Sequence, residues 1–322
     1  MSATQPRIRF GIIGLGRMGQ NHLRVLSLLN SAEVRFVFDM NSDLTARVAG
    51  QAGVSAAESV DAVLDEVDAV IIASPTTTHE GYARQCADRV RNIFVEKPMT
   101  DRLDTSLGLQ ELAAEKGLNL QVGFIERFNP AVGQMKQLLD RSEQVVSIDF
   151  ARTNKISARI TDVDVVTDLM IHDIDLALHF SGPVTDVSAH GVAEGEMIDY
   201  AAALLTHSNG RFSRIQASRI TDRKMRSIQA TCKDMFIDCE LLRKEITLSR
   251  QSEVEQRPGE PYRIIATEEK IEVRPHEALL LELQAFVASC HGEPTDGRPG
   301  AAEAVAAMEI CDRVQRAIYG RR

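Results

Sequence analysis

The chain has 322 residues, which is enough for two domains of ordinary size. Hydrophobic residues make up 44% and charged residues 26%, a balance typical of a globular protein with buried cores. The formal net charge of −9 argues against a nucleic-acid partner, because binding to phosphates depends on an excess of Lys and Arg.

Strand and helix patterns alternate in the first third of the chain. The strands are short apolar runs, and the run at 69–73 is apolar throughout, as in a strand covered on both faces. Such alternation predicts right-handed βαβ units around a parallel sheet. We expect strands at 8–13, 34–38, 69–73, 92–95 and 118–124, and helices at 18–29, 43–52, 58–64, 78–90 and 104–116.

The pattern changes after residue 124, where we place the domain boundary. Most of the segment 184–273 consists of strand patterns separated by turn residues. Sequential strands without helices between them predict a largely antiparallel sheet. We expect helices at 130–139, 165–180, 277–290 and 301–318, and a further strand at 145–152.

The first strand runs into the motif Gly-Leu-Gly-Arg-Met-Gly at residues 14–19, and a helix follows. In that context the motif is typical of dinucleotide binding. Gly14 permits the tight turn, Gly16 lets the backbone approach a pyrophosphate, and Gly19 lets the helix pack closely on the strand. The free amides and the positive dipole end of the helix then face the anion.

An acidic residue, Asp39, ends the second strand. A carboxylate there accepts hydrogen bonds from the adenosine ribose and repels a 2′-phosphate, so the sequence predicts NAD rather than NADP. Methyltransferases that use S-adenosylmethionine also pair a glycine loop with an acid, but the motifs further along argue against them. The expected fold class is an α/β Rossmann domain in residues 1–124, followed by an α+β domain with an open, mostly antiparallel sheet in residues 125–322.

A lysine follows the strand at 92–95, in the sequence Glu96-Lys97-Pro98. Ligands of an open parallel sheet bind beyond the C-terminal ends of its strands, so Lys97 is expected to point toward the cofactor. A lysine in that place suits proton transfer or the polarisation of a hydroxyl. Taken alone, the residue is better explained as a solvated lysine at a strand end.

The helix at 165–180 carries Asp168 and His172 four positions apart, and therefore on one face. An imidazole that a carboxylate orients from the adjacent turn is a competent general base. An ordinary surface pair fits the same spacing. A metal site would need a third well-spaced ligand, which the sequence does not offer, so we expect no metal.

Three motifs, the glycine motif, the lysine motif at 96–98 and the helix motif at 168–173, together resemble the glucose–fructose oxidoreductase / myo-inositol dehydrogenase (Gfo/Idh/MocA) family over nearly the whole chain. The resemblance implies metal-free catalysis by Lys97, Asp168 and His172, and an open sheet that mediates assembly into a homodimer or homotetramer. The residues expected to bind NAD are Gly14, Gly16, Arg17, Met18, Gly19, Asp39, Met40, Ser74, Thr76, His79, Glu96 and Lys97.

Residues 121–130 and 159–175 are also similar to one group within this family, the UDP-N-acetylglucosamine 3-dehydrogenases. These enzymes oxidise the sugar 3-hydroxyl to a 3-keto nucleotide sugar. Phe124 departs from the group, in which His is expected. Basic residues cluster at 152–159 and 219–226, as a diphosphate would require, although solvated charges at strand ends explain them equally. The expected substrate-binding residues are Glu126, Arg127, Asn129, Arg159 and His172.

The resulting hypothesis is hydride transfer from the sugar carbon to NAD, with His172 as the base, Asp168 orienting it and Lys97 polarising the reacting oxygen. Lys97 could instead be the base, and the sequence does not separate these roles. One alternative is a dehydrogenase of a free polyol or sugar such as inositol. Another is a non-catalytic, dinucleotide-sensing regulator, against which the presence of all three residues argues.

The five cysteines are scattered and form no C-x-x-C pair, which is typical of buried thiols in a reducing compartment. No apolar stretch precedes the first strand, and no run approaches the ~18–20 residues that span a bilayer. We therefore expect a cytoplasmic protein without a membrane partner.

Overall fold

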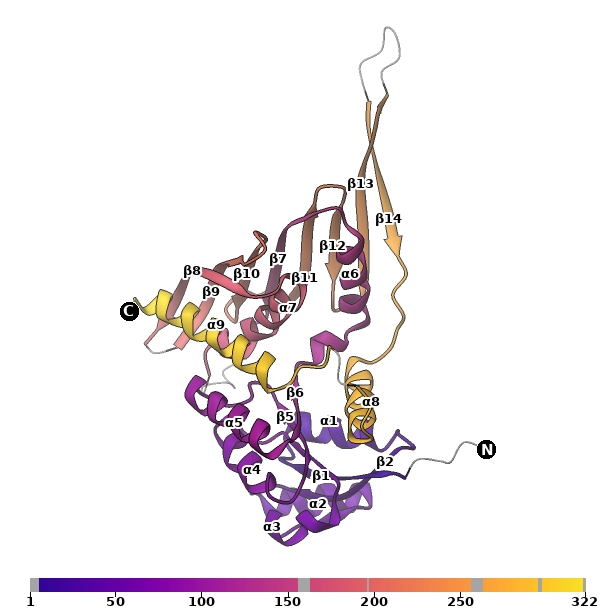
Figure 1. Cartoon of the computed structure of the whole chain (residues 1–322), viewed down its shortest axis with the longest axis vertical. Coiled ribbons are helices and arrows are strands. Elements are labelled where there is room, and N and C mark those ends of the chain that lie inside the picture. The colour runs from indigo at the N-terminus through magenta and orange to yellow at the C-terminus, as the bar shows by residue number, and fades with distance from the viewer. Residues whose placement is uncertain (1–5, 156–162, 196, 256–262, 295–296, 321–322) are drawn as a thin grey trace. The chain divides into compact units, whose positions relative to one another are not determined.

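The chain forms two β-sheets, and each belongs to a separate structural unit (Figure 1). Unit 1 is formed by Met1–Phe128 and Glu277–Met308, and unit 2 by Asn129–His276 and Glu309–Arg322. The sequence predicts one boundary, at residue 124. The structure differs, because the chain returns to unit 1 at Glu277–Met308. The structure, a computed structural model, describes residues 6–155, 163–195, 197–255, 263–294 and 297–320.

Helix α8, Ala278–Cys290, explains the return, because it completes the core of unit 1. Leu283 and Phe286 are fully buried. The Phe286 ring lies against Phe10 and Phe94, at centroid distances of 6.1 and 5.5 Å. The helix is apolar over most of its surface, so its sequence predicts burial without indicating which sheet it covers.

The sheet of unit 1 has six parallel strands in the order β3-β2-β1-β4-β5-β6. This arrangement confirms the predicted parallel α/β domain. The short β3 was not predicted, because two residues are too few to show a periodic pattern. The strands are β1 Ile8–Ile13, β2 Ala32–Phe38, β3 Ser55–Ala56, β4 Ala69–Ile72, β5 Asn92–Glu96 and β6 Asn119–Gly123.

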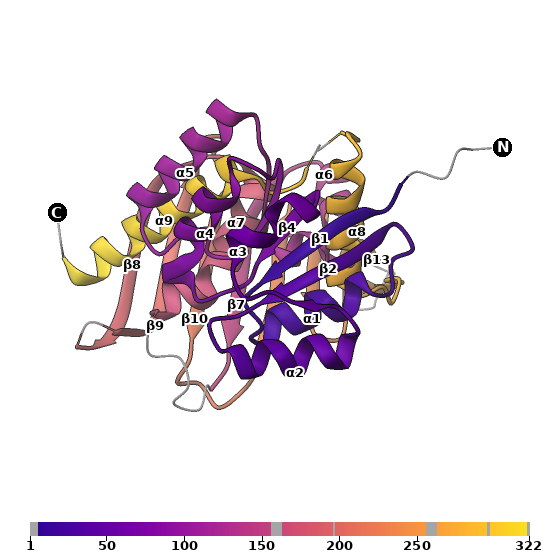
Figure 2. The same cartoon turned by 90° about the horizontal axis from the view of Figure 1, so that it is seen from below.

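Two helices of unit 1, α2 (Ser42–Ala52) and α5 (Leu103–Lys116), end where glycine allows the chain to turn. Gly53 follows α2 with a φ of 67° and Gly117 follows α5 with a φ of 60°, the left-handed conformation that closes a helix. Helices α4 and α5 lie side by side (Figure 2). The helical segments before α8 are α1 Arg17–Leu26, α2 Ser42–Ala52, α3 Val60–Val63, η1 Leu64–Glu66, η2 Thr76–Thr78, α4 His79–Cys86, α5 Leu103–Lys116 and η3 Ile125–Phe128.

The sheet of unit 2 has eight strands in the order β14-β13-β12-β11-β7-β10-β9-β8. All neighbouring pairs are antiparallel except β7 and β10, which confirms the prediction of a mostly antiparallel sheet. The strands are β7 Val145–Thr153, β8 Val184–Glu194, β9 Met197–His207, β10 Phe212–Ser218, β11 Met225–Cys232, β12 Phe236–Glu240, β13 Glu245–Glu255 and β14 Arg263–Ile271.

One face of this sheet is covered and the other is open. Ile148 and Phe150 of β7 are buried, and the Phe150 ring stacks on Phe180 of a helix. On the opposite face, Asp149 pairs with the exposed Arg214. The helical segments of unit 2 are α6 Pro130–Arg141, η4 Val166–Met170 and α7 Ile171–Ser181, and α9 Ala301–Tyr319 ends in this unit. In the described part of the chain, none of the helices has the length and apolar character to cross a membrane.

Candidate functional site

The glycine loop after β1 has the geometry that its three glycines predict. Gly14 has a φ of +94°, and a Cβ there would lie 2.4 Å from the backbone N of Ser74. A Cβ on Gly19 would lie 1.9 Å from the Gly14 carbonyl oxygen. By contrast, no described heavy atom comes within 4 Å of a Cβ built on Gly16. The loop is therefore closed on the protein side at Gly14 and Gly19, and open beside Gly16, where a ligand could approach.

Helix α1 begins at this loop with its N-terminal amides available. Its N-cap is Gly16, which has no side chain to cap the helix, and its first turn contains no acidic residue. Arg17 is exposed and Met18 is half-buried at the same end. Uncapped amides and the positive end of the helix dipole are suited to hold a pyrophosphate.

Asp39 stands at the end of β2 with its carboxylate held by two backbone amides. Leu15 N donates to Oδ2 at 2.8 Å and Asn41 N donates to Oδ1 at 2.9 Å. Burial and the Asp39 charge raise the pKa of the nearby Tyr82 phenol. A cavity of about 350 Å³ opens beside them, lined by Gly14, Gly16, Phe38, Asp39, Met40, Leu44, Ala73, Ser74, Pro75, Thr78 and Tyr82.

This cavity fits the adenosine half of a dinucleotide. It brings together residues of the β1, β2 and β4 ends, as predicted for the C-terminal edge of a parallel sheet. The side chain of Met40 is 83% exposed, so it is available to a ligand. The hydroxyls of Ser74 and Thr78, which also line the cavity, form a hydrogen bond of 2.7 Å. Thr76 is half-buried in η2.

His79 has a different position from the one its prediction suggests. Its ring is 1% exposed, with Nε2 2.9 Å from the Ser74 carbonyl oxygen and Nδ1 3.0 Å from that of Pro98. Burial lowers the pKa of the imidazole, and the two carbonyl contacts oppose that shift. We therefore expect His79 to link the loops after β4 and β5 rather than to contact NAD itself.

Lys97 follows β5 and is half-buried. Its backbone N donates to Oε2 of Glu96 at 3.2 Å. Oε1 of Glu96 lies 2.7 Å from Nε2 of His22, whose side chain is completely buried. Both oxygens of Glu96 thus bind the protein, so we expect Glu96 to support Lys97 and not to bind NAD directly. The His22–Glu96 pair was not foreseen, because the two residues are far apart in sequence.

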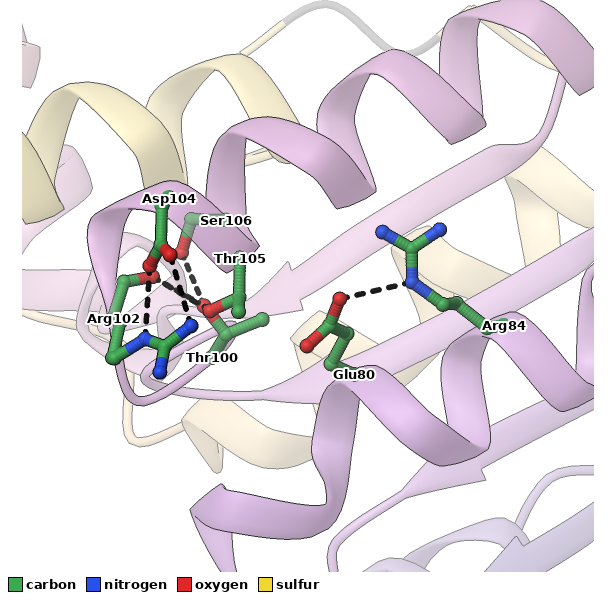
Figure 3. Close-up of polar contacts among 7 residues, drawn as sticks. All are labelled: Glu80, Arg84, Thr100, Arg102, Asp104, Thr105 and Ser106. Atoms are coloured by element: carbon green, nitrogen blue, oxygen red, sulfur yellow. Dashed lines mark hydrogen bonds and ion pairs between the residues drawn. The ribbon is translucent and has the colours of Figure 1, made fainter.

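The loop from Lys97 to α5 is held by a network of hydroxyl groups (Figure 3). The Thr100 hydroxyl, completely buried, donates to the Arg102 carbonyl at 2.8 Å and lies 2.5 Å from the Ser106 hydroxyl. Thr105 donates to Thr100 at 2.9 Å, and Arg102 binds Asp104 through two nitrogens. These contacts hold residues 100–106, the segment that follows Lys97 and leads into α5.

A buried acid, Glu282, lies in α8. It is fully buried, and neither carboxyl oxygen has a hydrogen-bond partner among the described residues. Burial, with smaller contributions from Glu96 and Glu126, raises the pKa of Glu282 well above its ordinary value. The surroundings of Glu282 therefore favour the neutral, protonated form of its carboxyl. Its only sequence signal is a lone acid in the apolar run of α8.

In unit 2, Asp168 and His172 occupy adjacent turns of one helical segment, as predicted. Asp168 lies in η4, a single π-helical turn, and His172 lies in the first turn of α7. Both are half-buried. Asp168 forms an ion pair with Arg219, with 3.6 Å between Oδ2 and Nη2. A carboxylate and an imidazole on adjacent turns are the components of an oriented general base.

The residue after His172 anchors the helix. Asp173 accepts two hydrogen bonds from Arg152 of β7, from Nε at 3.0 Å and from Nη2 at 2.8 Å, and both residues are 2% exposed. Arg152 belongs to a basic cluster that the sequence explains equally by a diphosphate or by solvated charges at strand ends. The structure instead places its guanidinium inside unit 2, where it holds α7 against the sheet.

The predicted substrate-binding residues before α6 lie in and after η3. Glu126 and Asn129 are each 7% exposed, and Arg127 is half-buried. Oδ1 of Asn129 accepts from Ala131 N at 3.1 Å and so caps α6. Phe124 is 1% exposed and fills the core. Arg159 is outside the described residues.

The second basic cluster occupies the sheet of unit 2. Arg223, Lys224 and Arg226 line a hollow of about 510 Å³ over β11–β13. Acidic residues share its lining, among them Asp238 and Glu240. The mixed charge does not favour a diphosphate over other ligands.

Comparison with known proteins places these features in a family. Residues 8–124 match the model of an oxidoreductase family with an NAD-binding Rossmann fold, and residues 145–236 match the family's C-terminal domain. UDP-N-acetylglucosamine 3-dehydrogenase of Acidithiobacillus ferrooxidans is 31% identical over 309 residues, which cover 94% of this chain and 96% of that enzyme. The chain belongs to the Gfo/Idh/MocA oxidoreductase family.

Further relatives and solved structures are similar to this Gfo/Idh/MocA member. The scyllo-inositol 2-dehydrogenase (NAD(+)) of Bacillus subtilis is 30% identical over 304 residues, covering 88% of this chain and 86% of that enzyme. A solved structure of the Acidithiobacillus ferrooxidans enzyme matches 99% of this chain and 100% of its own, with a TM-score of 0.88 and 29% identity. A levoglucosan dehydrogenase solved with NADH and levoglucosan has the same fold, with a TM-score of 0.83, 18% identity and coverage of 98% and 97%.

The comparisons confirm the predicted family, the oxidoreductase class and the NAD-binding Rossmann fold. They do not test the residues assigned to each role, which remain predictions.

Proposed function

We propose that this protein oxidises the 3-hydroxyl of UDP-N-acetylglucosamine to the 3-keto nucleotide sugar, with NAD as the acceptor. The observation that carries this proposal is the similarity to UDP-N-acetylglucosamine 3-dehydrogenase over almost the full length of both chains. The similarity extends through both units, so it includes the catalytic helix as well as the dinucleotide loop.

NAD rather than NADP is favoured by Asp39. Its carboxylate lines the cavity beside the glycine loop, and its amide contacts hold it where an adenosine ribose would lie. The α1 amides around Gly16 are free to hold the pyrophosphate. When bound, NAD supplies the acceptor for the hydride that leaves the sugar carbon.

The residues of the chain handle the proton and the oxygen. His172 removes the proton of the sugar hydroxyl, and Asp168 holds the imidazole and balances the charge that it gains. Lys97 donates a hydrogen bond to the same oxygen, which stabilises the negative charge that develops on it as the proton leaves. Glu126, Arg127 and Asn129 contribute to binding the nucleotide sugar.

A second candidate is the oxidation of a free polyol such as inositol, favoured by the similarity to scyllo-inositol 2-dehydrogenase. The two candidates are separated by incubating the protein with NAD⁺ and each of several UDP-sugars and inositols, while following the absorbance of reduced nicotinamide. We expect reduction with UDP-N-acetylglucosamine and none with the inositols. Reduction with an inositol alone would reject the nucleotide sugar, and no reduction with any of them, even with an aminotransferase present to remove a keto product, would favour a dinucleotide-sensing regulator.

The open sheet face of unit 2 supports a homodimer or homotetramer as the working state. The cysteines, four of them buried and none of them joined in a disulfide, favour a cytoplasmic location. Neither nucleic acid nor membrane is part of the proposal.

A further inference from the structure

Asp168 occupies an unusual piece of backbone. The turn Val166–Met170 is π-helical, and the N–H of Ile171 donates to the carbonyl of Val166, five residues earlier. Such turns are rare because their packing is poorer than that of an α-helix, and they occur frequently at functional sites. The turn therefore needs support from other parts of unit 2.

The start of the turn is supported by Asp164 and by the C-terminal helix. Oδ1 of Asp164 accepts from the backbone N of Val166 and of Thr167, each at 3.0 Å. Gln315 of α9 donates from Nε2 to Asp164 Oδ2 at 2.9 Å and to the Thr167 hydroxyl at 3.1 Å. These contacts fix the backbone before Asp168, but none of them reaches its carboxylate.

The carboxylate of Asp168 is met by Arg219. This arginine follows β10, where its own N donates to the Asp199 carbonyl at 2.9 Å. Its Nη2 donates to the Val163 carbonyl at 2.8 Å and lies 3.6 Å from Asp168 Oδ2. The side chains of Arg219 and Asp168 are 8% and 14% exposed. A guanidinium is always charged, and so deeply buried a charge requires a charged or strongly polar partner.

We propose that Arg219 is a positioning residue for Asp168. Arg219 keeps the Asp168 carboxylate in the orientation from which it can orient His172. This inference rests on the proposed function for its catalytic consequence. Through one nitrogen, Nη2, Arg219 donates a hydrogen bond to the segment before the turn and attracts the carboxylate electrostatically at 3.6 Å, which couples side-chain orientation to backbone geometry. By sequence, Arg219 belongs to a basic cluster that a diphosphate or solvated strand-end charges explain equally, whereas the geometry assigns it to the turn that carries Asp168.

A matched control lies on the same strand. Arg214 of β10 pairs with Asp149 through two nitrogens, on the open face of the sheet, and its side chain is 67% exposed. Arg214→Gln therefore removes an arginine–aspartate pair of unit 2 without touching the turn. Arg219→Lys is the informative conservative change, because both contacts of Arg219 use one nitrogen, which an ammonium can replace.

The experiment compares Arg219→Gln, Arg219→Lys and Arg214→Gln with the wild type, by steady-state kinetics and by amide hydrogen exchange of residues 166–171. We expect Arg219→Gln to lower kcat about 10–100-fold, as loss of an outer partner of a functional group typically does. The KM for NAD should stay within about twofold, since the dinucleotide loop is in unit 1. Exchange in the turn should accelerate, Arg219→Lys should recover part of both losses, and Arg214→Gln should keep the wild-type exchange of residues 166–171.

An unchanged kcat and unchanged exchange in Arg219→Gln would overturn the proposal, and so would an Arg219→Lys variant no better than Arg219→Gln. If the wild type turns over no sugar, the proposed function fails by itself. The exchange measurement then still decides the role of Arg219. Faster exchange of the turn in Arg219→Gln, but not in Arg214→Gln, supports it, and equal exchange rejects it.

Discussion

Replacing Asp39 by asparagine should change which dinucleotide the protein prefers. The substitution keeps the shape of the side chain and removes its charge. In the structure the carboxylate accepts from the amides of Leu15 and Asn41, so it is held at the edge of the cavity and cannot turn away from a ribose. The amide oxygen of asparagine can serve only one of those two donors.

The size of the effect follows from two contributions. Hydrogen bonds between ribose hydroxyls and a charged acceptor are stronger than those to a neutral one, and losing that advantage weakens NADH binding by about 1.5 kcal/mol. Two unit charges about 4 Å apart repel by about 4 kcal/mol near a protein surface, and solvent reduces this to about 2 kcal/mol at a half-exposed carboxylate. Removing the repulsion favours NADPH by that amount. Together the contributions predict a change of about 300-fold in the ratio of the two dissociation constants.

Fluorescence titration of the protein with NADH and with NADPH measures this ratio without any substrate. Asp43→Asn is the matched control, because Asp43 is an exposed acid at the start of α2 and outside the cavity lining. We expect the control to keep the wild-type preference for NADH. A change of less than about tenfold in Asp39→Asn, or an equal change in Asp43→Asn, would refute the reasoning.

Other substitutions test the catalytic groups and the packing. His172→Ala and Lys97→Met should each lower kcat by about 10²–10⁴-fold, and near-wild-type turnover in both would reject the catalytic assignment. Arg152→Met should destabilise the protein by about 3–5 kcal/mol, because it leaves Asp173 charged and buried, whereas the double variant Arg152→Met/Asp173→Leu should lose much less in chemical denaturation. Because the pKa of Glu282 is raised in the folded state, the folded protein retains a proton that the unfolded chain releases, so this group makes stability fall as pH rises above 4.5. Glu282→Gln should therefore raise Tm over the wild type more at about pH 8 than at about pH 5, and a pH-independent difference would contradict a protonated Glu282.

The parts of the fold that sequence could predict depend on short-range patterns. The apolar run of β4 and the glycine motif are each complete within a few residues. Short-range patterns of this kind are sufficient to predict the parallel sheet and the dinucleotide loop. The place of α8 does not follow, because an apolar helix fits either sheet. The π-helical turn at Asp168 could not be predicted either, because the sequence spacing of four residues between Asp168 and His172 is the same in an α-helix and in a π-helix.

The candidate site shows the same division. Asp39 could be predicted because its role depends on one strand end. His22 and Glu96, or Arg219 and Asp168, meet only after the chain has folded, and a single sequence holds no sign of such pairs. Arg152 shows the same limit: its sequence context is compatible with a diphosphate contact or with a solvated charge, whereas the structure buries it in a pair with Asp173.

The most direct test of the proposed reaction follows the hydrogen on the sugar carbon. The protein is incubated with NAD⁺ and UDP-N-acetylglucosamine that carries deuterium at C3, and the reduced dinucleotide is analysed by mass spectrometry. The account predicts deuterium in the NADH and a slower rate of hydride transfer than with unlabelled sugar. NADH that forms without deuterium, or no NADH from this sugar while an inositol is oxidised, would contradict it.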